Sequence, residues 1–209
     1  MTSVTAIQFQ SKGVTCRGDL YLPDTAGRAP IMVMAHGLGG TRNMRLPAFA
    51  ERFVAEGYGC LLFDYRHFGD SDGEPRQLLD IKKQLQDWKA AIEHARGLAQ
   101  VDPDRVILWG TSFSGGHVLA TAADDPRIAA VISQCPFTDG LASTLATEPL
   151  VSAKLTAKAL RDRLGALVGA APVMVAVAGR PGDTALMTAP DVWDGYMNLV
   201  PEEIGRAHV

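Results

Sequence analysis

Apolar runs and amphipathic stretches alternate along the first two thirds of the chain. Residues 6–10 and 14–21 alternate apolar and polar side chains and meet at Lys12-Gly13, a pattern that predicts two N-terminal strands. Continuous apolar runs then predict strands that are buried on both faces. These runs cover residues 31–35, 60–64, 106–109 and 128–133.

Helical periodicity fills the intervals between these runs. Residues 47–56 predict one helix, and apolar positions at three- and four-residue steps predict a longer amphipathic helix that packs one face on the sheet. Those positions are Leu78, Ile81, Leu85, Trp88, Ile92 and Ala95. Alternation of strands and helices predicts an α/β fold with a doubly wound, mostly parallel sheet.

The pattern changes near Gly140. Leucines then lie on alanine-rich helical segments, so we expect two regions, an α/β core over residues 1–140 and a helical and C-terminal segment over residues 141–209. From Pro172 a further apolar stretch predicts a strand followed by an acidic loop at Asp183. No clear strand pattern follows Asp183.

A strand, a sharp turn and a helix are predicted around Ser112. The apolar run 106–109 leads into Gly110, and small residues follow the serine at Ser114 and Gly115-Gly116. Small residues on both sides of a strained turn let the strand and the helix pass closely. Ser112 could instead be an ordinary helix cap, whereas neither common glycine-rich phosphate-binding motif can be written here.

Two more motifs precede this turn. His36-Gly37-Leu38-Gly39-Gly40 follows the strand at 31–35, and Phe63-Asp64-Tyr65-Arg66-His67-Phe68-Gly69-Asp70-Ser71 follows the next one. The three motifs resemble those of serine hydrolases of the α/β-hydrolase family: G-x-S-x-G with Ser114 as its last residue, H-G-x-G-G, and F-D-x-R-G-x-G-x-S with His67 at a glycine position. The resemblance covers residues 5–140.

The resemblance implies a nucleophile and an oxyanion hole. Ser112 would attack the acyl carbon of an ester, a thioester or a similar small-molecule substrate and form an acyl-serine, while the backbone N–H groups of Leu38 and Phe113 would bind the oxyanion. It implies no metal and no organic cofactor. It also implies that residues 141–209 contain a helical cap insertion and that the C-terminal strands of the core are incomplete.

Several polar side chains in these motifs have simpler explanations. We expect Asp64, Arg66 and Asp70 to bind the backbone of their own loop and one another, because turn-rich polar segments use such residues in this way. His36 precedes the nucleophile, whereas this fold takes its base from the end of the chain, so we expect a structural role for it.

The sequence does not determine which residues are the catalytic acid and the catalytic base. After Ser112 the chain has only His117, expected to pack behind the site, and His208. Three alternatives stay open. The acid and base are Asp183 and His208, or Asp139 is the acid and the histidine is missing, or both lie beyond Val209. A catalytically incomplete hydrolase-like domain and an acyltransferase are the alternative functions.

Composition limits the partners. The formal net charge is −3 and basic residues are interspersed with acidic ones, so we expect no nucleic-acid partner. No apolar run reaches membrane-spanning length and no signal peptide is evident, which predicts a cytoplasmic protein without a membrane partner. Cys16, Cys60 and Cys135 are expected to be reduced, largely buried thiols. Nothing in the sequence indicates an oligomeric state.

Overall fold

The structure is a computed structural model, and it describes residues 3–201. The chain divides into two compact units, Met1–Thr138 and Asp139–Val209. The division lies next to the change in sequence character at Gly140. None of the helices within residues 3–201 is long and apolar enough to cross a membrane.

The first unit is built on a six-stranded sheet. Its strands are β1 (Ser3–Ser11), β2 (Val14–Leu22), β3 (Ala29–Ala35), β4 (Gly59–Phe63), β5 (Val101–Thr111) and β6 (Ile128–Gln134). Their order across the sheet is β1-β2-β4-β3-β5-β6. β2 pairs antiparallel with β1 and β4, while the remaining pairs are parallel. The predicted mostly parallel sheet is therefore confirmed.

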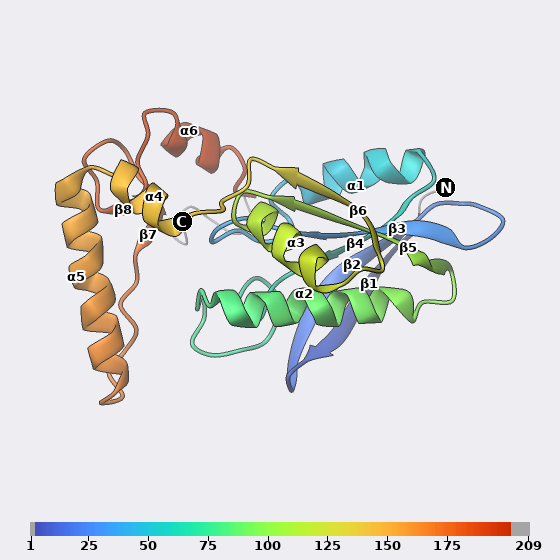
Figure 1. The fold of residues 1–209 in the computed structure, drawn as a ribbon, viewed down its shortest axis with the longest axis horizontal. Coiled ribbons are helices and arrows are strands. Elements are labelled where there is room, and N and C mark those ends of the chain that lie inside the picture. Colours follow the sequence, from blue (N-terminus) through green and yellow to red (C-terminus); the bar gives the residue numbers. More distant parts are fainter. Residues whose placement is uncertain (1–2, 202–209) are drawn as a thin grey trace. The chain divides into compact units, whose positions relative to one another are not determined.

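Helices cover both faces of this sheet. They are α1 (Leu46–Ala55), α2 (Ile81–Arg96) and α3 (Phe113–Asp124). α1 packs on one face, and α2 and α3 pack on the other (Figure 1). Burial on both faces accounts for the continuous apolar character of β3 and β4, all of whose residues from Ile31 to Ala35 and from Gly59 to Phe63 are buried.

The buried face of α2 differs from the predicted one at its N-terminal end. Leu78 precedes the helix and Ile81 is 51% exposed, because the helix begins only after Asp80, whose side chain accepts a hydrogen bond from the Lys83 backbone N–H at 3.0 Å. Gln84 and Asp87 are buried instead. Both have polar partners, described below, that offset the cost of burying them.

The second unit contains short elements around one long helix. They are α4 (Gly140–Ala146), α5 (Pro149–Ala166), β7 (Ala176–Ala178), β8 (Ala185–Met187) and α6 (Val192–Met197). The predicted leucine-bearing helices correspond to α4 and α5, and the strand expected before Asp183 is β7. β8 corrects the expectation that no strand follows Asp183. β7 and β8 pair in parallel in a small sheet of their own.

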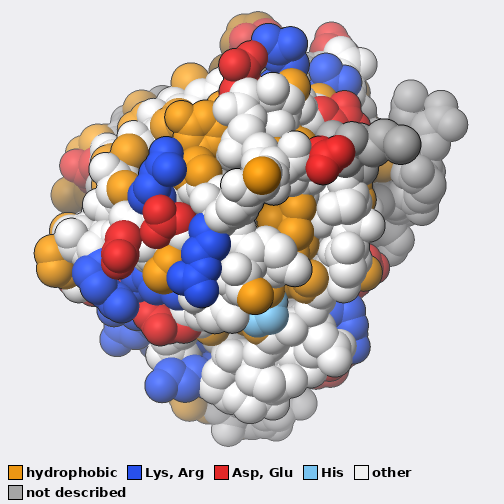
Figure 2. Space-filling view, turned by 90° about the vertical axis from the view of Figure 1, so that its right-hand side faces the viewer, with side chains coloured by type: hydrophobic (Ala, Val, Ile, Leu, Met, Phe, Trp, Pro, Cys, Tyr) orange, Lys and Arg blue, Asp and Glu red, His pale blue; other side chains and the backbone are white. Residues whose placement is uncertain are grey.

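Charged side chains do not gather by sign on the face that Figure 2 shows. Lysine and arginine side chains lie next to aspartate and glutamate side chains across this face. Opposite charges also pair on the surface of the first unit, as Lys89 does with Asp124 at 3.0 Å. This mixture is consistent with the small net charge of −3.

Candidate active site

Ser112 lies in a strained turn between β5 and α3. Its backbone dihedrals are φ 56° and ψ −116°, a combination that residues with a side chain rarely adopt. It occupies the N-cap position of α3, yet its side chain makes no capping hydrogen bond. The alternative that Ser112 serves as an ordinary helix cap therefore finds no support in the geometry.

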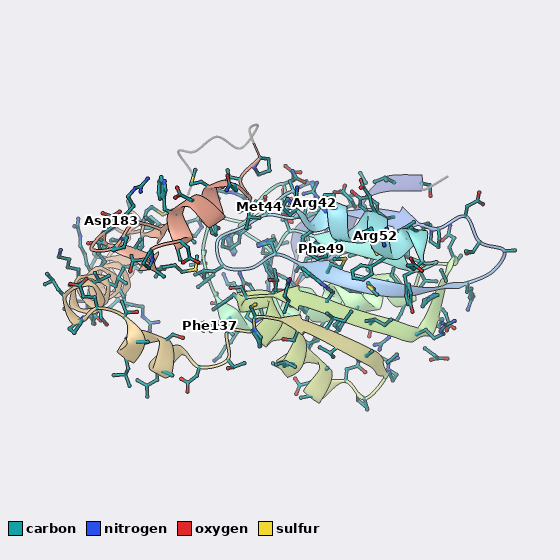
Figure 3. The ribbon with its side chains drawn as sticks, turned by 90° about the horizontal axis from the view of Figure 1, so that it is seen from above. Arg42, Met44, Phe49, Arg52, Phe137 and Asp183 are labelled. Carbon is teal, nitrogen blue, oxygen red and sulfur yellow. The ribbon has the colours of Figure 1, made fainter. Side chains whose placement is uncertain are left out.

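Backbone hydrogen bonds hold this turn in place. The Ser112 N–H donates to the Gln134 carbonyl at 2.9 Å, and its own carbonyl accepts from the Phe137 N–H at 2.9 Å. Both partners lie at or after the carboxyl end of β6, and Figure 3 labels Phe137. A strained conformation persists only where its surroundings fix it, and these bonds fix Ser112 from the neighbouring strand.

Steric contacts explain why the residues around the serine are small. A Cβ atom at Gly110 would overlap the carbonyl oxygen of Ser114, and one at Gly116 would overlap the carbonyl oxygen of Phe137. Ser114 itself is 0% exposed. The small residues of the motif therefore permit α3 to approach β5 and the segment after β6, as the sequence pattern predicted.

The glycine-rich loop after β3 passes directly beside Ser112. A Cβ atom at Gly37 would lie 3.2 Å from Ser112 Cβ and 3.7 Å from Ser112 Oγ. β3 and β5 are adjacent parallel strands, so the segments after their carboxyl ends meet at the same edge of the sheet. The structure thus brings together the two motifs that carry Leu38, Ser112 and Phe113.

His36 is a buried residue of the same loop. Its ring packs edge-on against Tyr65 with 4.7 Å between ring centroids, and its Nδ1 lies 3.0 Å from the Gly37 carbonyl oxygen. Burial lowers the pKa of His36, although nearby Asp64 acts in the opposite direction. A neutral, packed imidazole fits the structural role that the sequence predicted.

His117 packs behind the serine turn, as expected from the sequence. Its Nε2 lies 2.8 Å from Gln84 Oε1, and its ring contacts Phe113 with 4.9 Å between centroids. Burial, with a smaller contribution from His36, lowers the pKa of His117 to about 4. The imidazole is therefore neutral near pH 7 and its Nε2 is engaged with Gln84.

The charged residues of the third motif bind protein groups. The Asp70 N–H donates to Asp64 Oδ2 at 3.3 Å within the loop, as predicted, but their other partners lie outside it, which corrects the expectation. Asp64 Oδ1 accepts a hydrogen bond from the Arg42 backbone N–H at 2.7 Å, and Arg42 Nη2 donates to Asp70 at 2.8 Å. Arg66 pairs with Asp87 of α2 at 2.6 Å. Neither Arg42 nor Asp87 was predicted from the sequence, because no local pattern marks them as partners of this motif.

The contacts of His67 explain why a histidine can stand at a position where the family motif has glycine. Its φ of 73° lies in the left-handed region, where glycine is favoured and where the related motif has glycine. The imidazole Nδ1 lies 3.0 Å from the Pro75 carbonyl oxygen, and Nε2 lies 3.4 Å from Lys83 Nζ. These contacts offset part of the backbone strain at this position.

The candidate acids have local partners. Asp139 Oδ1 accepts from the Ala142 N–H at 2.9 Å at the start of α4, and Asp183 Oδ2 accepts from the Arg180 N–H at 2.7 Å in the loop after β7. Both belong to the second unit. His208 lies outside the described residues, and within residues 3–201 no histidine is hydrogen-bonded to Ser112 Oγ.

Comparison with known proteins identifies the family. A family model described as X-Pro dipeptidyl-peptidase (S15 family) matches residues 12–172. This chain belongs to that family. The family is part of the α/β-hydrolase superfamily, so the resemblance inferred from the three motifs is confirmed, as is the fold.

Individual relatives extend this result. The chain is 64% identical over 195 residues to the quorum-quenching protein AidA of Acinetobacter baumannii, covering 93% of this chain and 64% of AidA. It is 40% identical over 125 residues to the thiohydrolase aneE of Aspergillus aculeatus, covering 60% of this chain and 39% of that protein. The chain therefore spans less than two thirds of the length of both relatives.

A solved structure shows the same architecture. The α/β-hydrolase GrgF from Penicillium sp. sh18 superposes with a TM-score of 0.78 at 29% sequence identity. The match covers 97% of this chain and 67% of GrgF. The similarity therefore includes residues from both units of the S15-family chain.

Proposed function

We propose that this chain carries the nucleophile of a serine hydrolase that cleaves an ester, a thioester or a similar acyl bond. The observation that supports this most directly is the backbone of Ser112, which is held at φ 56° and ψ −116° between β5 and α3. The glycine loop after β3 lies beside its hydroxyl. A hydrolase of this superfamily needs both features at one point.

In the proposed reaction Ser112 Oγ attacks the carbonyl carbon of the substrate while its proton passes to a base. Negative charge then develops on the carbonyl oxygen, and the N–H groups of Leu38 and Phe113 would donate to it. Phe113 is the first residue of α3, where a backbone N–H has no partner within the helix and the helix dipole favours an anion. The alcohol or thiol leaves with the proton, and water then hydrolyses the acyl-serine.

We propose that the base is neither His36 nor His117. Both imidazoles are buried, and burial lowers the pKa of each. Asp183 with His208 is the acid–base pair that this chain itself could supply. The whole protein could instead use Asp139 or residues beyond Val209, so the proposed test includes His208.

The cysteines support a proposed cytoplasmic location. Cys16 and Cys60 are buried free thiols, and burial raises the pKa of Cys60 to about 12. Such thiols are unreactive, and free cysteines are typical of reducing compartments. Cys135 is exposed, which corrects the expectation that the thiols are largely buried.

Labelling with a fluorophosphonate probe tests the proposal. We expect labelling of the wild-type chain and none of Ser112→Ala. Ser114→Gly is the matched control, because it removes the neighbouring hydroxyl and restores the common family motif, and it should label like the wild type. Labelling that persists in Ser112→Ala would contradict the proposed nucleophile.

The histidine variant separates a complete site from an incomplete one. Rapid labelling that is lost in His208→Ala supports the Asp183–His208 pair. Slow labelling that is unaffected by His208→Ala supports the second candidate function, a catalytically incomplete domain. This candidate is favoured by the lack of a histidine bonded to Ser112 within residues 3–201. Weak turnover alone does not distinguish a complete site from an incomplete one, since a rate about 10³-fold above that in water can survive the loss of a triad member.

A further inference from the structure

The loop that carries Leu38 is anchored at its C-terminal end on one buried carboxylate, that of Asp64. We propose that Asp64 and Arg42 are positioning residues, which fix this loop so that the Leu38 N–H is held where the oxyanion forms. The proposal rests on the proposed function of Ser112. It extends that function to residues that contact neither the substrate nor the serine.

The loop needs support from outside itself. Gly37, Gly39 and Gly40 provide no side chains to anchor it, and Gly39 has a φ of 65°. One backbone bond across its glycines, from the Gly40 N–H to the Gly37 carbonyl, is long at 3.4 Å. An oxyanion donor must lie within a few tenths of an ångström of its working position, so a flexible glycine loop has to be fixed by its neighbours.

Arg42 fixes the C-terminal end of the loop. Its backbone N–H donates to Asp64 Oδ1 at 2.7 Å, and its guanidinium forms an ion pair with the same carboxylate. The guanidinium also donates to Asp19 at 2.7 Å and to Asp70 at 2.8 Å. Arg42, labelled in Figure 3, therefore ties the loop to β2 and to the segment after β4.

His36 holds the N-terminal end by packing, because its ring makes no hydrogen bond to Asp64. Its Nε2 lies 3.8 Å from Asp64 Oδ1, and its ring packs against Tyr65 and Phe68. Asp64 is only 1% exposed, and a Cβ atom at Gly69 would overlap its carboxylate, so the carboxylate cannot move away without disturbing the chain. One fixed side chain thus faces both ends of the loop.

The location of the ion pair between Arg42 and Asp64 favours a positioning role over simple stabilisation of the fold. A buried ion pair adds little net stability compared with apolar side chains of similar volume, because its charges must be desolvated. The loop it holds lies beside Ser112, so close that a Cβ atom added at Gly37 would be 3.2 Å from Ser112 Cβ. A shift of the loop by an ångström would therefore change the site before it changed the fold.

Hydrogen exchange measured by mass spectrometry on the full chain tests the positioning directly. Asp64→Asn keeps the shape of the side chain and removes its charge. We expect amides of residues 37–42 to exchange about ten-fold faster in this variant, with α1 amides unchanged. Lys89→Met, which breaks the exposed pair with Asp124, is the control and should leave the loop unaffected.

Fluorophosphonate labelling then tests the chemical consequence. We expect the rate constant of labelling to fall about 10²-fold in Asp64→Asn with the apparent affinity for the probe unchanged, because a misplaced donor affects the transition state and not ground-state binding. Arg42→Lys should show a smaller loss of the same kind, since lysine cannot reproduce the forked contacts. A fall in affinity alone would contradict the proposal.

Failures of the two proposals are distinguishable. A wild-type chain that does not label contradicts the proposed function, while the exchange of residues 37–42 still decides whether Asp64 holds the loop. Unchanged loop exchange in both Asp64→Asn and Arg42→Lys overturns the positioning role whatever the labelling shows. If Asp64→Asn does not fold, Arg42→Lys alone provides both measurements.

Discussion

The two units of the chain differ in how much of their apolar surface is buried. In the first unit the strands and helices enclose large, fully buried side chains such as Trp88 and Phe63. In the second unit α5 has Val151 as its one buried residue, while Leu160 and Leu164 are exposed, the latter by 65%. Apolar burial is the main source of folding free energy, so stability is concentrated in the first unit.

This difference explains where the candidate site is built. A strained serine and a glycine loop with left-handed backbone can persist only where the surrounding structure fixes them. Ser112 and Leu38 both lie at the carboxyl ends of strands in the well-buried sheet. The candidate acids Asp139 and Asp183 lie in the unit with little core, in a cap turn and a loop.

The largest expected contrast is between two side-chain truncations. Trp88 is fully buried and its Nε1 donates to the Tyr65 hydroxyl at 2.9 Å, so Trp88→Ala should cost about 3 to 5 kcal/mol of unfolding free energy. Leu164→Ala on α5 should change it by no more than about 0.5 kcal/mol. Urea denaturation followed by circular dichroism measures both. A large loss in Leu164→Ala would show that α5 has a core partner.

Two glycine substitutions give the next contrast. Gly110→Ala places a methyl group against the Ser114 carbonyl oxygen and should cost about 1 to 3 kcal/mol. Gly195→Ala in α6 meets nothing within 4 Å and should stabilise its helix by about 0.5 to 1 kcal/mol. The same denaturation experiment measures both. Equal effects would mean that the close approach of α3 to β5 does not constrain position 110.

Most of the first unit could be predicted because its periodicity follows burial directly. Strands β3 and β4 are buried on both faces, so their sequences are continuously apolar, and the turn around Ser112 needs small residues that stand out in the sequence. The start of α2 could not be predicted in this way. Its buried face includes Gln84 and Asp87, which are polar because they bind His117 and Arg66 across the fold.

The anchoring of the glycine loop was also beyond the sequence. Arg42 binds Asp19, Asp64 and Asp70, which come from distant parts of the chain, and no local pattern shows that these carboxylates converge. In the second unit, β7 and β8 are short and have weak alternation, so β8 was missed. The turn around Ser112 was recognisable since backbone geometry limits which side chains are allowed near it, whereas Leu38 and Phe113 were assigned only through the resemblance to the family motifs.

The pH dependence of stability should also separate the units. The pKa of His117 is lowered by burial to about 4, against 6.5 when exposed. The unfolded chain therefore binds this proton more readily, and stability falls as the pH drops from about 6.5 towards 4, by about 2 kcal/mol at pH 5. Residues 139–201 contain no histidine, so this loss belongs to the first unit.

His117→Gln tests this assignment, because its amide nitrogen can replace Nε2 as a donor to Gln84. Urea denaturation at pH 7 and pH 5 should show a loss on acidification that is smaller by about 2 kcal/mol than in the wild type. An equal loss in both proteins would place the acid sensitivity in other groups. His36, His67 and His94, whose pKa values burial also lowers, would then be the next to replace.

The smallest contrast compares two helix caps. Asp80 and Asp139 each accept a hydrogen bond from the backbone N–H three residues later, at 3.0 and 2.9 Å. Asp80→Ala should lower the unfolding free energy of the first unit by about 1 kcal/mol. Asp139→Ala should instead increase hydrogen exchange within α4 and leave the first unit unchanged, because α4 has no buried residue.

Fluorophosphonate labelling at the wild-type rate in Asp139→Ala would agree with a capping role alone, whereas a fall of about 10³-fold or more would identify Asp139 as the catalytic acid.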